Sequence, residues 1–269
     1  MSLIILFFLF SFQLHASSGE DIRKMAAAQN PESALLEIKK RFDSGPLDKK
    51  SQQDLKAISE LIFGTFYQEK TLHLYEMGKH LLLKDIAGAV NTFSKAAEIE
   101  PYNGKVLLAL LRAKLALKQC SSAREILDKN QIFYPFIEEL QLIEGQTYAC
   151  MEESLKLKEW LENNWGLKAF FELSMTLLAA HSAFLNSEFS RAKKLIQQIQ
   201  QLDAAFPVVL YWQWRLTAET DSEKQSFGEK YVAKCTEMTV SDKKRYLVEP
   251  LTCASVSDIK TLIKKGENP

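Results

Sequence analysis

Apolar residues recur along most of this chain at the three- and four-residue spacing of an amphipathic helix. In DIAGAVNTFSKAAEIEP, residues 85–101, Ala89, Phe93 and Ala96 are four and three residues apart, and so share one face of a helix. Pro101 ends that helix, because the residue before a proline is disfavoured in the α region. Alternating strand patterns bounded by turn residues are absent from the sequence. We therefore expect an all-α protein.

The same pattern returns 34 residues further on. In CSSAREILDKNQIFYP, residues 120–135, an alanine, a leucine and a proline take the places of Ala89, Phe93 and Pro101. Weaker cycles follow, and a fifth could begin after Pro207. The positions that carry the pattern are Gly78, Ala89, Phe93, Ala96, Pro101, Ala123, Leu127, Pro135, Gly145, Tyr148 and Ala192. A fixed period of this length indicates a helical repeat protein.

In these residues the chain resembles the tetratricopeptide repeat (TPR) family, whose units are 34-residue helix-turn-helix pairs. The resemblance covers roughly residues 70–220, and residues 85–150 carry most of it. The sequence departs from the family pattern at Leu111, where a glycine is expected, and at Asn130, which replaces the second alanine. The resemblance implies an α-solenoid of antiparallel helix pairs in a right-handed superhelix, with flanking helices.

The N-terminus resembles a secretory signal peptide. The apolar run LIILFFLFSF, residues 3–12, is shorter than the ~20 residues that span a bilayer, and small residues suited to cleavage follow it. A buried helix or an uncleaved anchor is the alternative. The expected organisation is a signal peptide at 1–18, flanking helices at 19–68, about four repeats at 69–220, and capping helices with a tail at 221–269. We expect an exported protein, periplasmic or secreted, with no transmembrane segment after cleavage.

Four cysteines would remain in the mature chain, and an even number suits disulfide bonds in an oxidising compartment. Four cysteines allow three pairings, and four reduced, buried thiols are the alternative. In the repeat register, Cys120 ends the first helix of one unit and Cys150 lies near the end of the equivalent helix of the next. That register favours Cys120–Cys150, which leaves Cys235–Cys253 to join the last long helix to the tail.

Charge and motifs argue against several classes of function. Lysine plus arginine and aspartate plus glutamate both number 34, without the basic excess of a nucleic-acid-binding protein. No HExxH, GxSxG, CxxC, GxGxxG or Walker pattern occurs. We therefore expect no catalytic residues, cofactor, metal or small-molecule substrate. The four tryptophans, all between residues 160 and 214, either line a ligand site or fill gaps between helices.

The resemblance also implies a concave face that holds a peptide of a partner protein. Carried over in register, this groove comprises Leu72, Tyr75, Lys79, Lys105, Leu108, Arg112, Leu142, Gln146, Ala149, Leu177, His181 and Phe184. Lys79 and Arg112 could meet an acidic group of the peptide, because arginine forks suit carboxylates. The asparagines of the family's carboxylate clamp are missing, so binding of chaperone tails is not expected.

These observations predict an exported scaffold or adaptor that binds another protein or peptide and helps to assemble or tether an envelope or secreted complex. A structural subunit held in a larger complex by flat helix faces is the first alternative. A helical-solenoid enzyme acting on cell-wall material is the second, although no acid/base or nucleophile constellation is visible.

Overall fold

The computed structural model describes residues 19–28, 30–130, 137–218, 221–246 and 248–265. All regular secondary structure in these ranges is helical, which confirms the predicted all-α class. The predicted signal peptide and Pro135 lie outside the described residues. None of the described helices is long and apolar enough to cross a membrane.

The chain divides into two compact units, residues 1–62 and residues 63–269. The first contains α1 (Gly19–Ala27), α2 (Pro31–Asp43) and most of α3 (Lys49–Gly64). Asn30 caps α2, since its side chain accepts a hydrogen bond from the backbone N–H of Ser33 at 3.2 Å. The apolar faces of these helices bury Ile22, Leu35, Ile38, Ile58 and Ile62.

The second unit is a series of helix pairs. They are α4 (Glu69–Leu82) with α5 (Ile86–Ile99), α6 (Gly104–Ala116) with α7 (Cys120–Lys129), α8 (Glu138–Cys150) with α9 (Ser154–Asn164), α10 (Glu172–Leu185) with α11 (Phe189–Leu202), and α12 (Pro207–Leu216) with α13 (Glu223–Thr236). The first helices start at residues 69, 104, 138, 172 and 207, which are 34 or 35 residues apart. The second helices, which start at 86, 120, 154, 189 and 223, keep the same spacing. The spacing therefore continues past residue 220.

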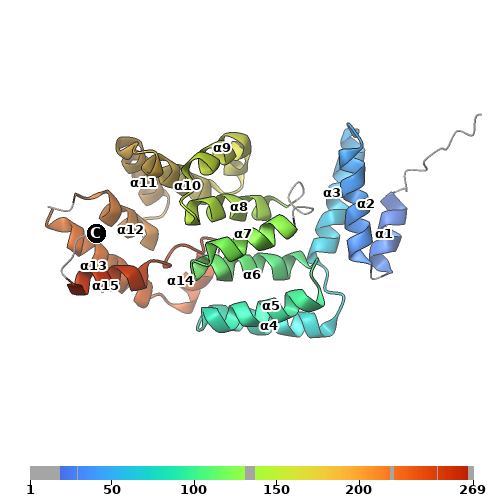
Figure 1. Ribbon diagram of the computed structural model, residues 1–269, viewed down its shortest axis with the longest axis horizontal. Helices are drawn as coiled ribbons and strands as arrows, with labels where there is room; N and C mark the ends of the chain where they lie inside the picture. The colour runs from blue at the N-terminus through green and yellow to red at the C-terminus, as the bar shows by residue number, and fades with distance from the viewer. Residues whose placement is uncertain (1–18, 29, 131–136, 219–220, 247, 266–269) are drawn as a thin grey trace, which may run out of the picture. The chain divides into compact units, whose positions relative to one another are not determined.

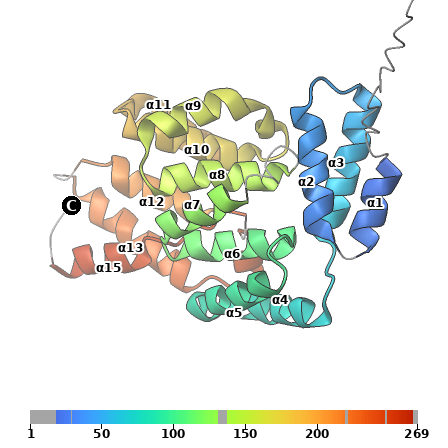
Figure 2. The same ribbon diagram turned by 45° about the vertical axis from the view of Figure 1, so that its right-hand side comes forward.

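The helices of a pair run side by side, as α4 and α5 do in Figures 1 and 2. A 3-10 helix, η2 (Trp165–Ala169), follows α9, while α14 (Val240–Arg245) and α15 (Val256–Lys265) follow the last pair. Figures 1 and 2 show α12, α13 and α15 together at one end of this unit.

The turns between paired helices also repeat. Lys118, Glu152 and Ser187 follow α6, α8 and α10, and all three have a left-handed backbone with φ of 56°, 56° and 61°. The next N–H in each turn bonds back five residues: Gln119 to Lys114 O, Glu153 to Tyr148 O and Glu188 to Ala183 O, at 2.8–3.0 Å. This is the hydrogen bond of a Schellman helix end. The repeat is therefore present in the backbone as well as in the sequence.

Small residues of the pattern let paired helices approach closely. A Cβ atom at Gly78 would clash with the ring of Phe93, and one at Gly145 would lie 2.5 Å from the indole of Trp160. The alanine and leucine positions that are described, with Phe93, are fully buried: Ala89, Ala96, Ala123, Leu127 and Ala192. The pattern read from the sequence thus marks the contact between the two helices of a pair.

Two disulfide bonds join distant parts of the second unit. Cys120–Cys150 and Cys235–Cys253 have Cα–Cα distances of 5.7 and 5.8 Å, which is the predicted pairing. The predicted place of Cys120 was wrong, because α6 ends at Ala116 and Cys120 is the first residue of α7. It still reaches Cys150, because that residue ends α8, in the next pair.

Candidate functional site

The segment between α14 and α15, residues 248–255, lies against the first helices of the repeats, and we call it the C-terminal segment. Gln146 of α8 donates its side-chain N–H to the carbonyl of Val248 at 2.9 Å. The hydroxyl of Tyr231 in α13 donates to the carbonyl of Thr252 at 3.1 Å. Just before the segment, Lys243 Nζ donates to the carbonyl of Leu83, after α4, at 2.9 Å. The second unit therefore binds an irregular stretch of its own polypeptide.

The central part of the predicted groove is filled by this segment. Gln146, Ala149, Leu177 and His181 lie together around a cavity of ≈ 130 Å³. The other wall of this cavity includes four residues of the C-terminal segment, namely Glu249, Leu251, Ala254 and Ser255. The structure thus brings these four predicted groove residues together, with the chain's own tail as their partner.

The N-terminal part of the predicted groove is built around aromatic rings. The Tyr75 ring centroid lies 5.1 Å from that of Phe66, and the Lys79 ammonium lies 5.2 Å from the Tyr75 centroid. Lys79 also pairs with Glu76 at 2.9 Å, and Lys105 Nζ lies 5.6 Å from the Phe66 centroid. Of the predicted apolar residues, Leu72 is exposed while Leu108 and Leu142 are buried.

Glu249 is a fully buried carboxyl group. Burial raises its pKa from the ordinary value of 4.5 to about 7, although Ser174, Gln146 and the charge of Arg112 partly offset that rise. Arg112 itself pairs with Glu139 at 3.6 Å. Within the described chain, Glu249 Oε1 and Arg112 Nε have no hydrogen-bonding partner. Arg112 therefore already has one carboxylate partner in this chain, Glu139, and lies close enough to Glu249 for its charge to act on that group.

His181 is held neutral. Burial, and to a lesser extent the charge of Arg215, lower its pKa from 6.5 to about 3. Its ring lies 5.0 Å from that of Trp212 in an edge-on contact. This environment fits a packed histidine in the interior of the helix array.

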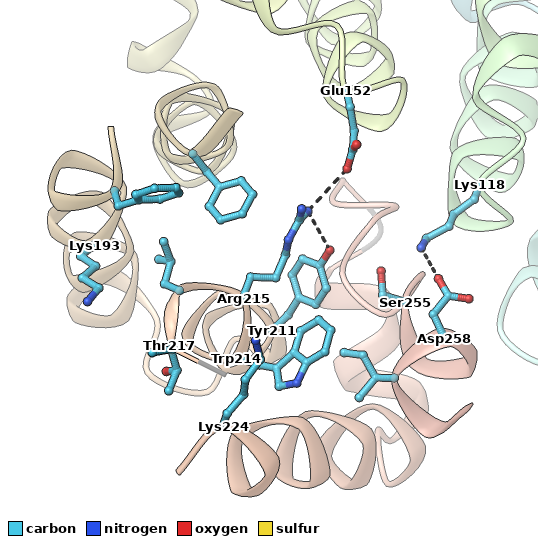
Figure 3. Close-up of a pocket in the computed structure, with 15 residues that line it drawn as sticks. Lys118, Glu152, Lys193, Tyr211, Trp214, Arg215, Thr217, Lys224, Ser255 and Asp258 are labelled. Atoms are coloured by element: carbon cyan, nitrogen blue, oxygen red, sulfur yellow. Dashed lines mark hydrogen bonds and ion pairs between the residues drawn. The ribbon is translucent and has the colours of Figure 1, made fainter. Parts of the chain in front are cut away.

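A second, larger cavity of ≈ 810 Å³ lies beside the C-terminal segment, among α10, α11, α12, α13 and α15 (Figure 3). We call it the aromatic cavity. Its walls include the rings of Phe184, Phe189, Tyr211 and Trp214. Four cations and two carboxylates also line it: Lys118, Lys193, Arg215, Lys224, Glu152 and Asp258. Of the predicted groove residues, Phe184 contributes to this cavity.

Arg215 of α12 lies against two of these rings, those of Phe184 and Tyr211. Its guanidinium carbon lies 4.4 Å from the Phe184 centroid and 5.9 Å from the Tyr211 centroid. It donates to the Tyr211 hydroxyl at 3.2 Å and pairs loosely with Glu152 at 3.6 Å. Stacking on aromatic faces orients an arginine while its N–H groups stay free to donate hydrogen bonds. Some of the guanidinium's hydrogen-bonding capacity therefore remains for a ligand.

The other charges of the aromatic cavity are unevenly paired. Lys118 forms an ion pair with Asp258 across the cavity rim. Lys224 is only 5% exposed, and its ammonium lies 5.5 Å from the Trp214 centroid. Lys193 is exposed on α11. In the part of the chain that the structure describes, neither Lys193 nor Lys224 forms an ion pair.

Trp160, Trp212 and Trp214 are buried in core clusters, and Trp214 also lines the aromatic cavity, whereas Trp165 is 46% exposed. Three of the four tryptophans therefore fill space between helices. The sequence did not identify Arg215 and Lys224 as cavity residues, although the tryptophans of WQWRL beside Arg215 were a signal for the first.

Among the described residues, no cluster of histidine, cysteine and acidic side chains could hold a metal ion. Comparison with protein-family models, curated proteins and solved structures finds no match for this chain.

Proposed function

We propose that this chain is an exported, TPR-like scaffold that binds a segment of a partner protein. The helix pairs at 34- and 35-residue spacing, and the glycine and alanine contacts within them, support a superhelical solenoid of that kind. Two disulfide bonds fit an oxidising compartment, as expected of a secreted or periplasmic protein.

The observation that carries this proposal is the C-terminal segment. An amide side chain of α8 binds a backbone carbonyl of that segment, and apolar and polar side chains of three helices enclose it. Helix surfaces that bind an irregular stretch of the chain's own backbone in this way have the chemistry needed to bind a partner's backbone. Where the segment already lies, the surface is filled, so the partner is assigned to the adjoining aromatic cavity.

The aromatic cavity has the size and lining of a binding site. Its ≈ 810 Å³ falls within the range of about 300–1,000 Å³ that is typical of ligand sites. Large aromatic rings beside an arginine are the residue types that dominate binding energy at protein interfaces. A few side chains of a partner segment would fill this space.

Phe189 offers a direct test, because its ring lines the aromatic cavity and is 50% exposed. The Phe189→Ser variant should lose a partner that the wild-type chain captures from the native exported fraction. Phe170→Ser is the matched control, since Phe170 is 71% exposed and does not line this cavity. Capture of the same partner by wild type and control, but not by Phe189→Ser, is the expected result.

Equal capture by all three proteins would place the contact on another surface. That result would favour the alternative of a structural subunit held by flat helix faces. Thermal unfolding of each variant would show whether the chain remains folded, so a lost partner can be attributed to the missing ring.

A further inference from the structure

The aromatic cavity carries more positive charge than its own carboxylates balance. Of its four cations, Arg215 and Lys118 face Glu152 and Asp258, whereas Lys193 and Lys224 have no carboxylate partner within the described chain. An uncompensated pair of ammonium groups attracts an anionic ligand.

Because Lys224 is buried, its part of this excess positive charge acts within the cavity. Lysine is almost never fully buried without a partner, yet Lys224 is 5% exposed, and its ammonium group contacts the face of Trp214 and forms no ion pair with a described residue. Lys224 lines the wall of the cavity beside Trp214. A ligand carboxylate would supply the ion-pair partner that this ammonium group lacks among the described residues.

The cations are spread over several elements. Figure 3 shows Lys193 and Lys118 on opposite sides of the cavity, with Arg215 between them. A single small anion cannot contact all of these positions, but an extended chain with several carboxylates can. The rings of Phe184 and Phe189, in T-shaped contact at 5.6 Å, offer an apolar surface within the same cavity.

We propose that the aromatic cavity binds an acidic segment of the partner polypeptide. Carboxylate side chains of that segment pair with Lys193 and Lys224, and a neighbouring apolar or aromatic side chain packs on Phe184 and Phe189. A further carboxylate can replace Glu152 on Arg215, since the existing pair is 3.6 Å long and Glu152 is largely exposed. The inference rests on the proposed function, whose site it assigns to a class of ligand.

The test uses the full-length, disulfide-bonded protein and a random copolymer of glutamate and tyrosine as the probe. Binding is followed by tryptophan fluorescence, which Trp214 in the cavity wall reports, and by sedimentation. Lys193→Gln and Lys224→Met should each weaken binding about tenfold, which corresponds to the loss of one partly desolvated ion pair. Binding should also weaken as salt is added.

Two controls distinguish binding at this cavity from a general effect of the protein's charge. Lys194→Gln and Lys230→Gln remove the same charge from α11 and α13 at exposed positions outside the cavity, and should bind like wild type. A copolymer of lysine and tyrosine should not bind. Because Lys193 is exposed, its variant keeps the test decisive even if Lys224→Met unfolds.

Equal binding by the cavity variants and their controls would overturn the proposal, as would no binding to wild type. Binding of anionic phospholipid vesicles instead, dependent on Lys193, would also overturn it in favour of a membrane surface. If the copolymer fails while Phe189→Ser still loses the captured partner, the ligand class is wrong and the proposed function stands. If Phe189→Ser also retains the partner, both fail.

Discussion

At the scale of single residues, the placement of Glu249 has the clearest energetic consequence. Its carboxyl group is enclosed by Arg112, Gln146 and Ser174, and the nearby His181 is neutral. Burial disfavours the charged form, so the folded protein binds a proton more tightly than the unfolded chain does. The C-terminal segment is therefore held best when Glu249 is protonated.

The pH dependence follows from the direction of this shift. The pKa is raised from 4.5 to about 7 on folding, so this group's contribution to stability is complete below pH 4.5 and is lost as pH rises to about 7. Glu249→Gln removes that loss, because the amide stays neutral. Its free energy of unfolding should exceed that of wild type by up to about 3 kcal/mol near pH 8, and match it near pH 4.

Denaturant unfolding of both proteins at the two pH values, with disulfides intact, measures this difference. An advantage of the same size at both pH values would mean that the carboxyl group does not titrate between the folded and unfolded states as described. The result would then reflect packing of the amide alone.

At the scale of helices and turns, the sequence predicted the repeated contacts between paired helices but not the contacts that the tail makes. Gly78, Phe93 and Gly145 could be found because close contact between paired helices restricts these positions, and the sequence repeats them. Lys224 and Glu249 could not: Lys224 lies in a helix pair whose sequence no longer shows the pattern, although its helices keep the spacing, and Glu249 lies in the tail beyond the repeats. The predicted groove could be located, but its filling by residues 248–255 depends on long-range packing.

The repeated turns give a stability prediction. Ser187 adopts φ of 61° and is exposed, and a left-handed backbone costs about 1–2 kcal/mol in a residue with a Cβ atom. Ser187→Gly relieves that cost but adds freedom to the unfolded chain, so we expect a net gain of about 0.5–1 kcal/mol. Ser187→Ala keeps the Cβ atom and should give no gain.

Thermal and denaturant unfolding of the two variants measure this effect. If Ser187→Gly is less stable than Ser187→Ala, the left-handed turn after α10 is wrong. The equivalent turns at Lys118 and Glu152 are poorer test sites, since both side chains also form ion pairs.

At the scale of the whole molecule, the second unit combines two features. Repeated helix pairs build a continuous surface, and the disulfide-linked tail closes its central part. The aromatic cavity adjoins the end of the C-terminal segment at Ser255, and two of its cations, Lys193 and Lys224, form no ion pair with a described residue. We therefore propose the cavity, rather than the filled central part, as the surface for the partner segment.

Site-specific photo-crosslinking tests this account most directly. A photoreactive phenylalanine analogue replaces Phe189 in one protein and Phe170 in another, and each is exposed to light in the native exported fraction. We predict that the probe at Phe189 crosslinks a partner protein through a segment rich in aspartate and glutamate, and that the probe at Phe170 does not. A partner crosslinked only from Phe170, or none from either position, would contradict the assignment of the aromatic cavity.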